Sequence, residues 1–202
     1  RSPSGIARSI RLAREGQQKS LSDLLDAHRN YLRLLAASCL HREMQGKADP
    51  SDVVQETLLK VHENFHQFRG TTELEWMAWL RKILVRNLAD LQRGFDRQRR
   101  AVDREQSLED LVDRSSAMLL GLVPAAGPSP SEQAHRREMG ALVADTLAEL
   151  DDEAREVVIL RSLNELEWPE IAERMERSPD AARMLWARAL RRVGTLLKEK
   201  GK

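Results

Sequence analysis

The chain has 202 residues, of which 41% are hydrophobic and 32% charged, and its formal net charge is +1 at pH 7. This size fits one large or two small domains, and the balanced charge gives no general argument for nucleic-acid binding. Cys39 is the single cysteine, which excludes an intrachain disulfide framework and a cysteine-based zinc site. No apolar run approaches the ~18 residues needed to span a membrane, so we expect no membrane insertion.

The first half of the chain is predicted to form a series of helices. Residues 6–15 are basic and weakly amphipathic, and we expect a frayed or accessory helix there, within an N-terminal extension over residues 1–19. A longer helix is predicted from about Ser20 or Ser22 to Met44. Asp49 followed by Pro50 is a typical helix start, which predicts a helix from Ser51 to about His66. Its polar and exposed faces carry Asp52, Gln55, Glu56 and Leu59.

The stretch from Phe65 to Arg97 combines an apolar and a basic helix face. Thr72 and Glu75 form a capping box, so a helix should begin near Thr72 or Glu73. Apolar residues recur with a helical period, and a second face is basic. Because Trp76 and Trp79 lie one turn apart beside the arginines, this helix could hold unstacked bases. The apolar positions are Trp76, Leu80, Ile83, Leu84, Leu88, Leu91 and Phe95; the basic ones are Lys82, Arg86, Arg93 and Arg97, with Asn87 at the border and Asp90 interrupting.

The pattern changes at residues 98–128, which we interpret as a flexible linker between two domains. The segment Ser107–Leu122 is mixed and has room for a short helix, and Pro124–Pro130 is rich in turn residues. Beyond it, helix starts are predicted at Ser129, Asp151, Trp168 and Ser178. With no convincing strand, the fold class expected is all-α, with two small helical domains joined by the linker.

The last two predicted helices have helix-turn-helix spacing. Ile171 and Ala172 lie in the first, and Leu185, Ala189 and Val193 give the second an inner face. Residues at the start of the second helix would reach base edges in the major groove. An ordinary helical hairpin is the alternative, and Glu176 in a turn where Gly is common counts against the motif. The exposed positions are Asp180, Arg183, Met184, Ala187 and Arg188.

One motif points to different chemistry. His62, Glu63 and His66 match HExxH, in which two histidines bind zinc and the glutamate acts as general base. Catalytic zinc needs a third protein ligand, and the only histidine downstream is His135, beyond the linker. We therefore interpret the pair as surface histidines and predict no metal site.

Taken together, the parts resemble the extracytoplasmic-function (ECF) sigma factors of bacterial RNA polymerase. The resemblance covers roughly Leu21 to Leu197, both domains and the linker. Each motif is short, but their order and spacing together are specific. The motifs are Asp52-Val-Val-Gln55-Glu56, Phe68-Arg69-Gly70, Trp79-Leu80 with Ile83, Asn87-Leu-Ala-Asp90 with Arg93, and Glu170-Ile171-Ala172 followed by Arg183 and Arg188-Ala189.

The resemblance implies a role for each segment. Residues 20–97 would be sigma domain two, 98–128 the linker and 129–202 sigma domain four. The polymerase-binding face would be Asp52, Gln55, Glu56 and Leu59. The minus-ten contacts would be Phe68, Arg69, Gly70, Thr71, Thr72, Trp76, Arg86, Asn87, Asp90 and Arg93, with either Arg86 or Asn87 facing the base. The minus-thirty-five contacts would be Ser178, Asp180, Ala181, Arg183, Met184, Ala187 and Arg188.

The function implied is that of a promoter-specificity subunit that assists promoter melting and is not itself an enzyme. Its partners would be bacterial core polymerase, promoter DNA and an anti-sigma factor, in the cytoplasm, with no cofactor. One rival hypothesis is a free-standing helix-turn-helix regulator, which would bind duplex DNA alone but leaves the acidic helix face and the basic first domain without a role. A zinc hydrolase is the remote alternative.

Overall fold

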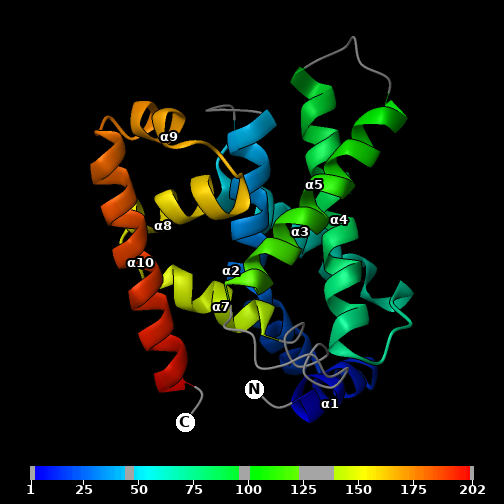
Figure 1. The fold of residues 1–202 in the computed structure, drawn as a ribbon. Helices are drawn as coiled ribbons and strands as arrows, with labels where there is room; N and C mark the ends of the chain where they lie inside the picture. The colour runs from blue at the N-terminus through cyan, green and yellow to red at the C-terminus, as the bar shows by residue number, and fades with distance from the viewer. Residues whose placement is uncertain (1–2, 44–47, 96–100, 123–138, 201–202) are drawn as a thin grey trace. The chain divides into compact units, whose positions relative to one another are not determined.

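The structure is a computed structural model that describes residues 3–43, 48–95, 101–122 and 139–200. All regular elements in these ranges are helical, which confirms the predicted fold class (Figure 1). The chain divides into two compact units, Arg1–Asp113 and Arg114–Lys202, which we describe separately. None of the described helices combines the length and the apolar character needed to cross a membrane.

The first unit is a helical bundle in which α2 is central. It contains α1 (Pro3–Arg14), α2 (Gln18–Glu43), α3 (Pro50–Asn64), the 3-10 turn η1 (Phe65–Gln67) and α4 (Glu73–Phe95). Helix α2 packs against α1, α3 and α4, and α3 also packs against α4. The predicted starts are confirmed, because the side chain of Asp49 accepts a hydrogen bond from the Ser51 N–H at 2.6 Å and α4 begins at Glu73.

Helix α1 is part of this bundle and not a frayed end. Ile6 and Ile10 are buried, with only 6% and 1% of their surface exposed, and α1 packs on α2. A Schellman motif ends the helix: the Gln17 N–H donates to the Leu12 carbonyl, and Gly16 has a φ of +90°. The burial of an apolar face, which a weak sequence pattern did not reveal, fixes this helix in place.

The predicted linker, residues 98–128, contains more regular structure than expected. Helix α5 (Ala101–Gly121) occupies most of it, and the division between the two units falls within this helix. Arg81 of α4 connects the N-terminal part of α5 to the first unit, because its guanidinium donates to Asp113 at 2.8 Å and to the Tyr31 hydroxyl at 3.2 Å. The Pro124–Pro130 stretch and the predicted helix start at Ser129 lie outside the described residues.

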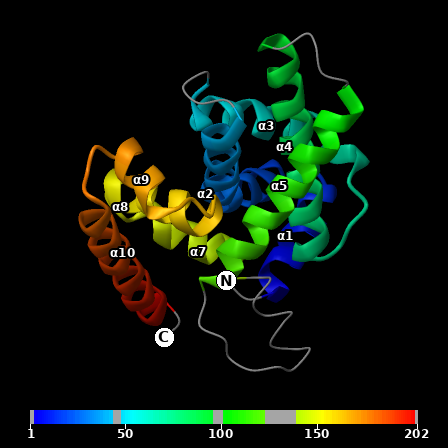
Figure 2. The same ribbon diagram turned by 45° about the horizontal axis from the view of Figure 1, so that its top comes forward.

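The second unit places a long C-terminal helix against three short ones. It contains α7 (Gly140–Ala148), α8 (Asp152–Val158), the π-helical η2 (Ile159–Leu163), α9 (Trp168–Arg174) and α10 (Pro179–Lys200). Helix α10 contacts α7, α8 and α9 (Figure 2). Two predicted caps are confirmed: Asp151 accepts from the Ala154 N–H at 2.8 Å, and Ser178 accepts from the Ala181 N–H at 3.2 Å.

Candidate nucleic-acid interface

A short loop, residues 68–72, connects η1 to α4, and the predicted capping box holds its C-terminal end. The Glu75 carboxylate accepts from the N–H groups of Thr71 and Thr72 at 2.8 and 3.0 Å, and Thr72 Oγ1 accepts from the Glu75 N–H at 3.2 Å. These bonds, of which the one from Thr71 is the largest cause, hold the pKa of the Glu75 carboxyl below its ordinary value. The carboxylate is therefore ionised at neutral pH, and the side chains of Arg69, Thr71 and Thr72 stay exposed.

Gly70 is required at its position by close packing. A Cβ added there would lie 2.6 Å from Glu75 Cβ and 2.6 Å from Cζ of Phe68. Because real Cβ atoms essentially never come this close to other heavy atoms, a larger residue would force the loop or its neighbours to shift. The glycine of the Phe68-Arg69-Gly70 motif thus has a steric explanation.

Four aromatic rings form a cluster beneath the loop. Ring centroids of Phe68 and Trp76 are 5.3 Å apart, those of Phe68 and Trp79 5.0 Å, and those of Phe65 and Trp76 6.0 Å. The indole N–H of Trp76 donates to Nδ1 of the buried His28 at 3.3 Å. Such edge-to-face and tilted contacts make the cluster a rigid support for the loop.

Burial corrects two of the predicted base contacts. Trp76 has 0% of its surface exposed and Phe68 only 4%, so neither ring has a face open to a nucleotide base. Trp76 was predicted from its proximity to basic residues and Phe68 from the resemblance to ECF sigma factors, but both rings point into the core of the bundle. Trp79, which is partly exposed, is the one tryptophan of this helix with accessible surface.

The basic face of α4 is exposed as predicted over the part that the structure describes. Lys82, Arg86 and Arg93 are all exposed, and Arg97 lies outside the described residues. Asp90 is exposed among them and forms an ion pair with Arg93 on its own helix. Arginine and lysine side chains on one helix face provide the contacts to phosphate that nucleic-acid binding needs.

Arg86 and Asn87, between which the sequence left the base contact open, differ in their packing. Asn87 is buried, and its amide donates to the Val53 carbonyl and to Thr57 Oγ1, both at 3.1 Å. Its amide oxygen accepts from Lys60 Nζ at 2.8 Å. Asn87 therefore joins α4 to α3 through its side-chain amide, whereas the Arg86 side chain is exposed.

We expect Asn87→Ala and Arg86→Ala to affect different properties. Asn87→Ala should lower the free energy of unfolding by about 1–3 kcal/mol, because it leaves buried polar partners unsatisfied. Arg86→Ala should change that free energy by less than about 0.5 kcal/mol and instead weaken nucleic-acid binding. Chemical denaturation and a DNA-binding assay on both variants separate the two. An altered base preference in Asn87→Ala, with stability unchanged, would show that Asn87 reads the base.

A polar face of α3 lies next to this interface. Asp52, Gln55 and Glu56 are exposed, and Leu59 has 53% of its surface exposed; these positions follow one another along the same side of the helix. Lys60 Nζ lies 3.4 Å from a Glu56 carboxylate oxygen and 3.8 Å from one of Asp90. One lysine thus links the acidic face of α3 to the basic face of α4.

In the second unit, α9 and α10 form a helix-turn-helix. Ile171 and Ala172 are buried against α10, as the motif requires. The turn has a left-handed residue, Glu176, with a φ of +51°, and the Arg177 N–H donates to the Ala172 carbonyl at 2.9 Å. Glutamate therefore fills the left-handed position that glycine usually takes. Arg177 also pairs with Glu153 of α8 at 2.5 Å, which attaches the turn to the rest of the unit.

The N-terminal half of α10 presents the predicted base-reading residues. Arg183 and Arg188 are exposed, and Met184 has 64% of its surface exposed, the largest value among the exposed large hydrophobic residues described. Ser178 caps the helix, Asp180 is exposed, and Ala181 and Ala187 are half-buried. Apart from these two alanines, the predicted residues of this element are open to solvent.

Two tryptophans that the sequence analysis did not assign to the interface lie beside it. The Arg183 guanidinium is 5.6 Å from the ring centroid of Trp168 and 2.8 Å from a carboxylate oxygen of Asp180. Trp168 packs edge-on against Trp186, whose indole N–H donates to Ser162 Oγ at 3.0 Å. Trp168 lies at the start of α9, 15 residues before Arg183 in the sequence, so only the crossing of the two helices reveals the contact.

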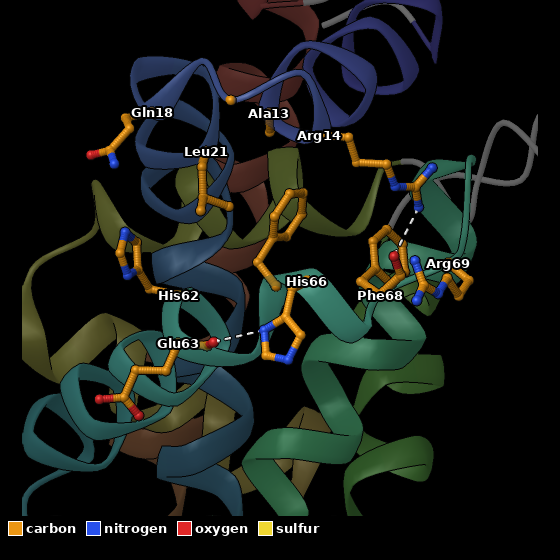
Figure 3. A pocket seen from close by; sticks show the side chains of 11 residues that line it. Ala13, Arg14, Gln18, Leu21, His62, Glu63, His66, Phe68 and Arg69 are labelled. Carbon is orange, nitrogen blue, oxygen red and sulfur yellow. Dashed lines mark hydrogen bonds between the residues drawn. The ribbon is translucent and has the colours of Figure 1, made fainter.

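The HExxH residues do not form a metal site in the described part of the chain. His62, Glu63 and His66 are exposed, and Nδ1 of His66 lies 3.1 Å from the backbone carbonyl of Glu63. No group of three or more His, Cys, Asp or Glu side chains is placed to bind a metal ion among the residues searched, and His135 lies outside them. The three residues instead line a groove of about 530 Å³ between α1, α2, the end of α3 and η1 (Figure 3).

Comparisons with known proteins agree on one family. The model of the family described as Sigma-70, region 4 matches residues 141–193. The chain is 30% identical over 185 residues to the RNA polymerase sigma factor CnrH of Cupriavidus metallidurans, covering 92% of this chain and 90% of that protein. It is 25% identical over 167 residues to the ECF RNA polymerase sigma-E factor of Haemophilus influenzae, covering 83% and 82%. A solved structure of CnrH in complex with the cytosolic domain of CnrY is 24% identical, covers 96% of this chain and 98% of that chain, and gives a TM-score of 0.36.

A helix-turn-helix and a separate basic helix face, in a chain whose described elements are all helical, are typical of DNA-binding proteins of transcription. The chain belongs to the ECF sigma factors of RNA polymerase. Its function is to direct core polymerase to specific promoters and to assist promoter melting when transcription starts. The predicted family and function are confirmed, and the free-standing regulator and the zinc hydrolase are not favoured.

Proposed function

We propose that this sigma factor binds its different partners through separate exposed surfaces, which are described above. The α3 face of Asp52, Gln55, Glu56 and Leu59 docks on core polymerase. The loop at residues 68–72 and the basic face of α4 bind the minus-ten element, and the exposed start of α10 reads the minus-thirty-five element. In this assignment residues 20–97 act as sigma domain two and residues 129–202 as sigma domain four, joined by the segment 98–128.

The observation that carries the proposal is the difference in charge between two exposed helix faces of the first unit. On α3 the exposed residues are acidic or uncharged, apart from Lys60 at the edge, and include one leucine. Such a face repels DNA phosphates but suits a protein partner. On α4 the exposed face has Lys82, Arg86 and Arg93, which suits DNA. Two surfaces of different character in one bundle support two different partners.

A charge reversal tests the polymerase surface. Glu56→Lys should raise the Kd for core polymerase about tenfold or more, because the new positive charge would be repelled by a polymerase surface that is complementary to an acidic face. A tenfold change in Kd is about 1.4 kcal/mol. Asp26→Lys on α2 is the matched control, since each carboxylate forms one surface ion pair on its own helix, Glu56 with Lys60 and Asp26 with Arg29. Binding to labelled core polymerase and run-off transcription are the measurements. Unchanged core binding in Glu56→Lys, with the fold intact, would contradict the assignment.

We also propose that this sigma factor acts in the cytoplasm without catalysis of its own and is held inactive by a protein regulator. CnrH, a relative over most of this chain, has been solved in complex with the cytosolic domain of CnrY. A regulator that covers the α3 or α4 face would compete with polymerase. Competition between a purified regulator and core polymerase for this protein is the measurement, and simultaneous binding of both would argue against it.

A further inference from the structure

Arg14, the last residue of α1, forms hydrogen bonds with the backbone of the loop at residues 68–72. Its Nη2 donates to the backbone carbonyl of Phe68 at 3.1 Å and to that of Gly70 at 2.5 Å. Its guanidinium carbon is 5.4 Å from the centroid of the Phe68 ring. Figure 3 shows the side chain extended from α1 toward the loop. A charged donor on two carbonyls of one short loop is a strong restraint, since hydrogen bonds to charged groups exceed neutral ones in strength.

The position from which Arg14 reaches the loop is fixed. Ile6, Ile10 and Ala13 are buried, and the Schellman motif at Gly16 ends α1 directly after Arg14 and Glu15. A side chain on a packed helix end loses less freedom on forming these bonds than one on a mobile tail. Helix α1 therefore acts as an anchor for the guanidinium, a role that its basic, weakly amphipathic sequence did not suggest.

The loop has open space into which it could otherwise move. Arg14 and Phe68 both line the groove of about 530 Å³, together with Leu21, Phe65 and His66. Gly70, in contrast, is packed so closely against Glu75 and Phe68 that no Cβ fits. Without Arg14, no side chain from α1 would hold the first half of the loop, and this half could move into the groove. Its second half stays fixed by the Glu75 carboxylate.

We infer that Arg14 is a positioning residue for minus-ten recognition: it holds the loop in the shape that presents Arg69, Thr71 and Thr72 to the unpaired strand. The inference rests on the proposed function of this loop. Arg14 acts through the loop backbone and not by attracting DNA. Holding the loop in its binding shape before the strand arrives reduces the ordering cost of binding, which is how preorganisation raises affinity.

The test uses the full chain bound to core polymerase and a single-stranded oligonucleotide with the minus-ten sequence. Arg14→Ala should weaken binding of this strand roughly tenfold, the effect of losing a charged hydrogen-bonding group. Core binding should stay unchanged, and the thermal unfolding midpoint should fall only slightly, since Arg14 is exposed. Arg14→Lys, which keeps the charge but lacks the planar donor group, should recover only part of the affinity. Arg11→Ala, an exposed arginine on the same helix, is the matched control and should bind as the unaltered protein does.

Three results would overturn the inference. If Arg14→Lys binds normally and Arg11→Ala loses as much affinity as Arg14→Ala, only the charge of α1 matters. If Arg14→Ala binds normally while Arg69→Ala is impaired, the loop contacts DNA without needing Arg14, and the inference fails by itself. If both Arg14→Ala and Arg69→Ala bind normally, the loop is not a DNA contact, and the proposed function of this loop falls together with the inference.

Discussion

Trp76→Ala is expected to lower the free energy of unfolding of the first unit by about 3–5 kcal/mol, the cost of removing a large ring from a packed core. Trp76 is fully buried, contacts Phe65, Phe68 and Trp79, and donates its indole N–H to His28. The ring also supports the loop from below. Minus-ten binding and polymerase binding should therefore be lost together, because both surfaces belong to the same bundle.

Trp79→Ala is the matched control for this variant. Trp79 belongs to the same cluster, one turn along α4, but is partly exposed. Its removal should cost less stability, because less surface is taken from the core. Chemical denaturation followed by tryptophan fluorescence and circular dichroism measures both variants. If Trp76→Ala unfolded at the same denaturant concentration as the unaltered protein and lost only minus-ten binding, Trp76 would be a base contact after all.

Arg183→Ala is expected to remove about 1–3 kcal/mol of discrimination at one base pair of the minus-thirty-five element, if its guanidinium forms a bidentate contact with that base pair. Arg183 is exposed in the first half of α10, where a recognition helix reaches base edges. In the free protein its guanidinium is placed by Asp180 and by the ring of Trp168. A side chain that is already partly oriented loses less freedom when it binds.

Selectivity is measured by run-off transcription with core polymerase on a promoter library that has all four bases at each minus-thirty-five position. Arg192→Ala is the control, because Arg192 is exposed on the same helix, nine residues further along the sequence and so on its opposite side. It should leave the base preference intact. If Arg183→Ala lowers transcription equally for all sequences, Arg183 contacts phosphate and does not read a base.

Features that depend only on residues close together in the sequence could be predicted from the sequence alone. The caps at Asp49, Thr72, Asp151 and Ser178 each join residues two or three positions apart, and all are present in the structure. A cap needs only a suitable side chain next to free backbone N–H groups, so it can be recognised from a few residues. The buried positions of α2 and the first turns of α4 follow from the helical period in the same way.

The α5 helix shows where local reasoning was incomplete. Residues 98–128 have a mixed pattern that predicted a linker with a short helix at most, yet α5 extends over Ala101–Gly121. Part of its stability comes from contacts outside the helix, such as the pair between Asp113 and Arg81 of α4. Tertiary contacts of this kind stabilise helices whose own period is weak.

What only the tertiary structure decided is which polar and aromatic side chains face the solvent. Arg86 and Asn87 are adjacent in sequence at the border of one helix face, and a step of about 100° per residue leaves both acceptable as base contacts. The bonds of Asn87 to Val53 and Thr57, more than 25 residues earlier, turn it inward. In the same way Arg14 reaches the loop across 54 and 56 residues of sequence. A helical period determines which residues share a face, but the element that packs against that face determines which of their side chains are covered.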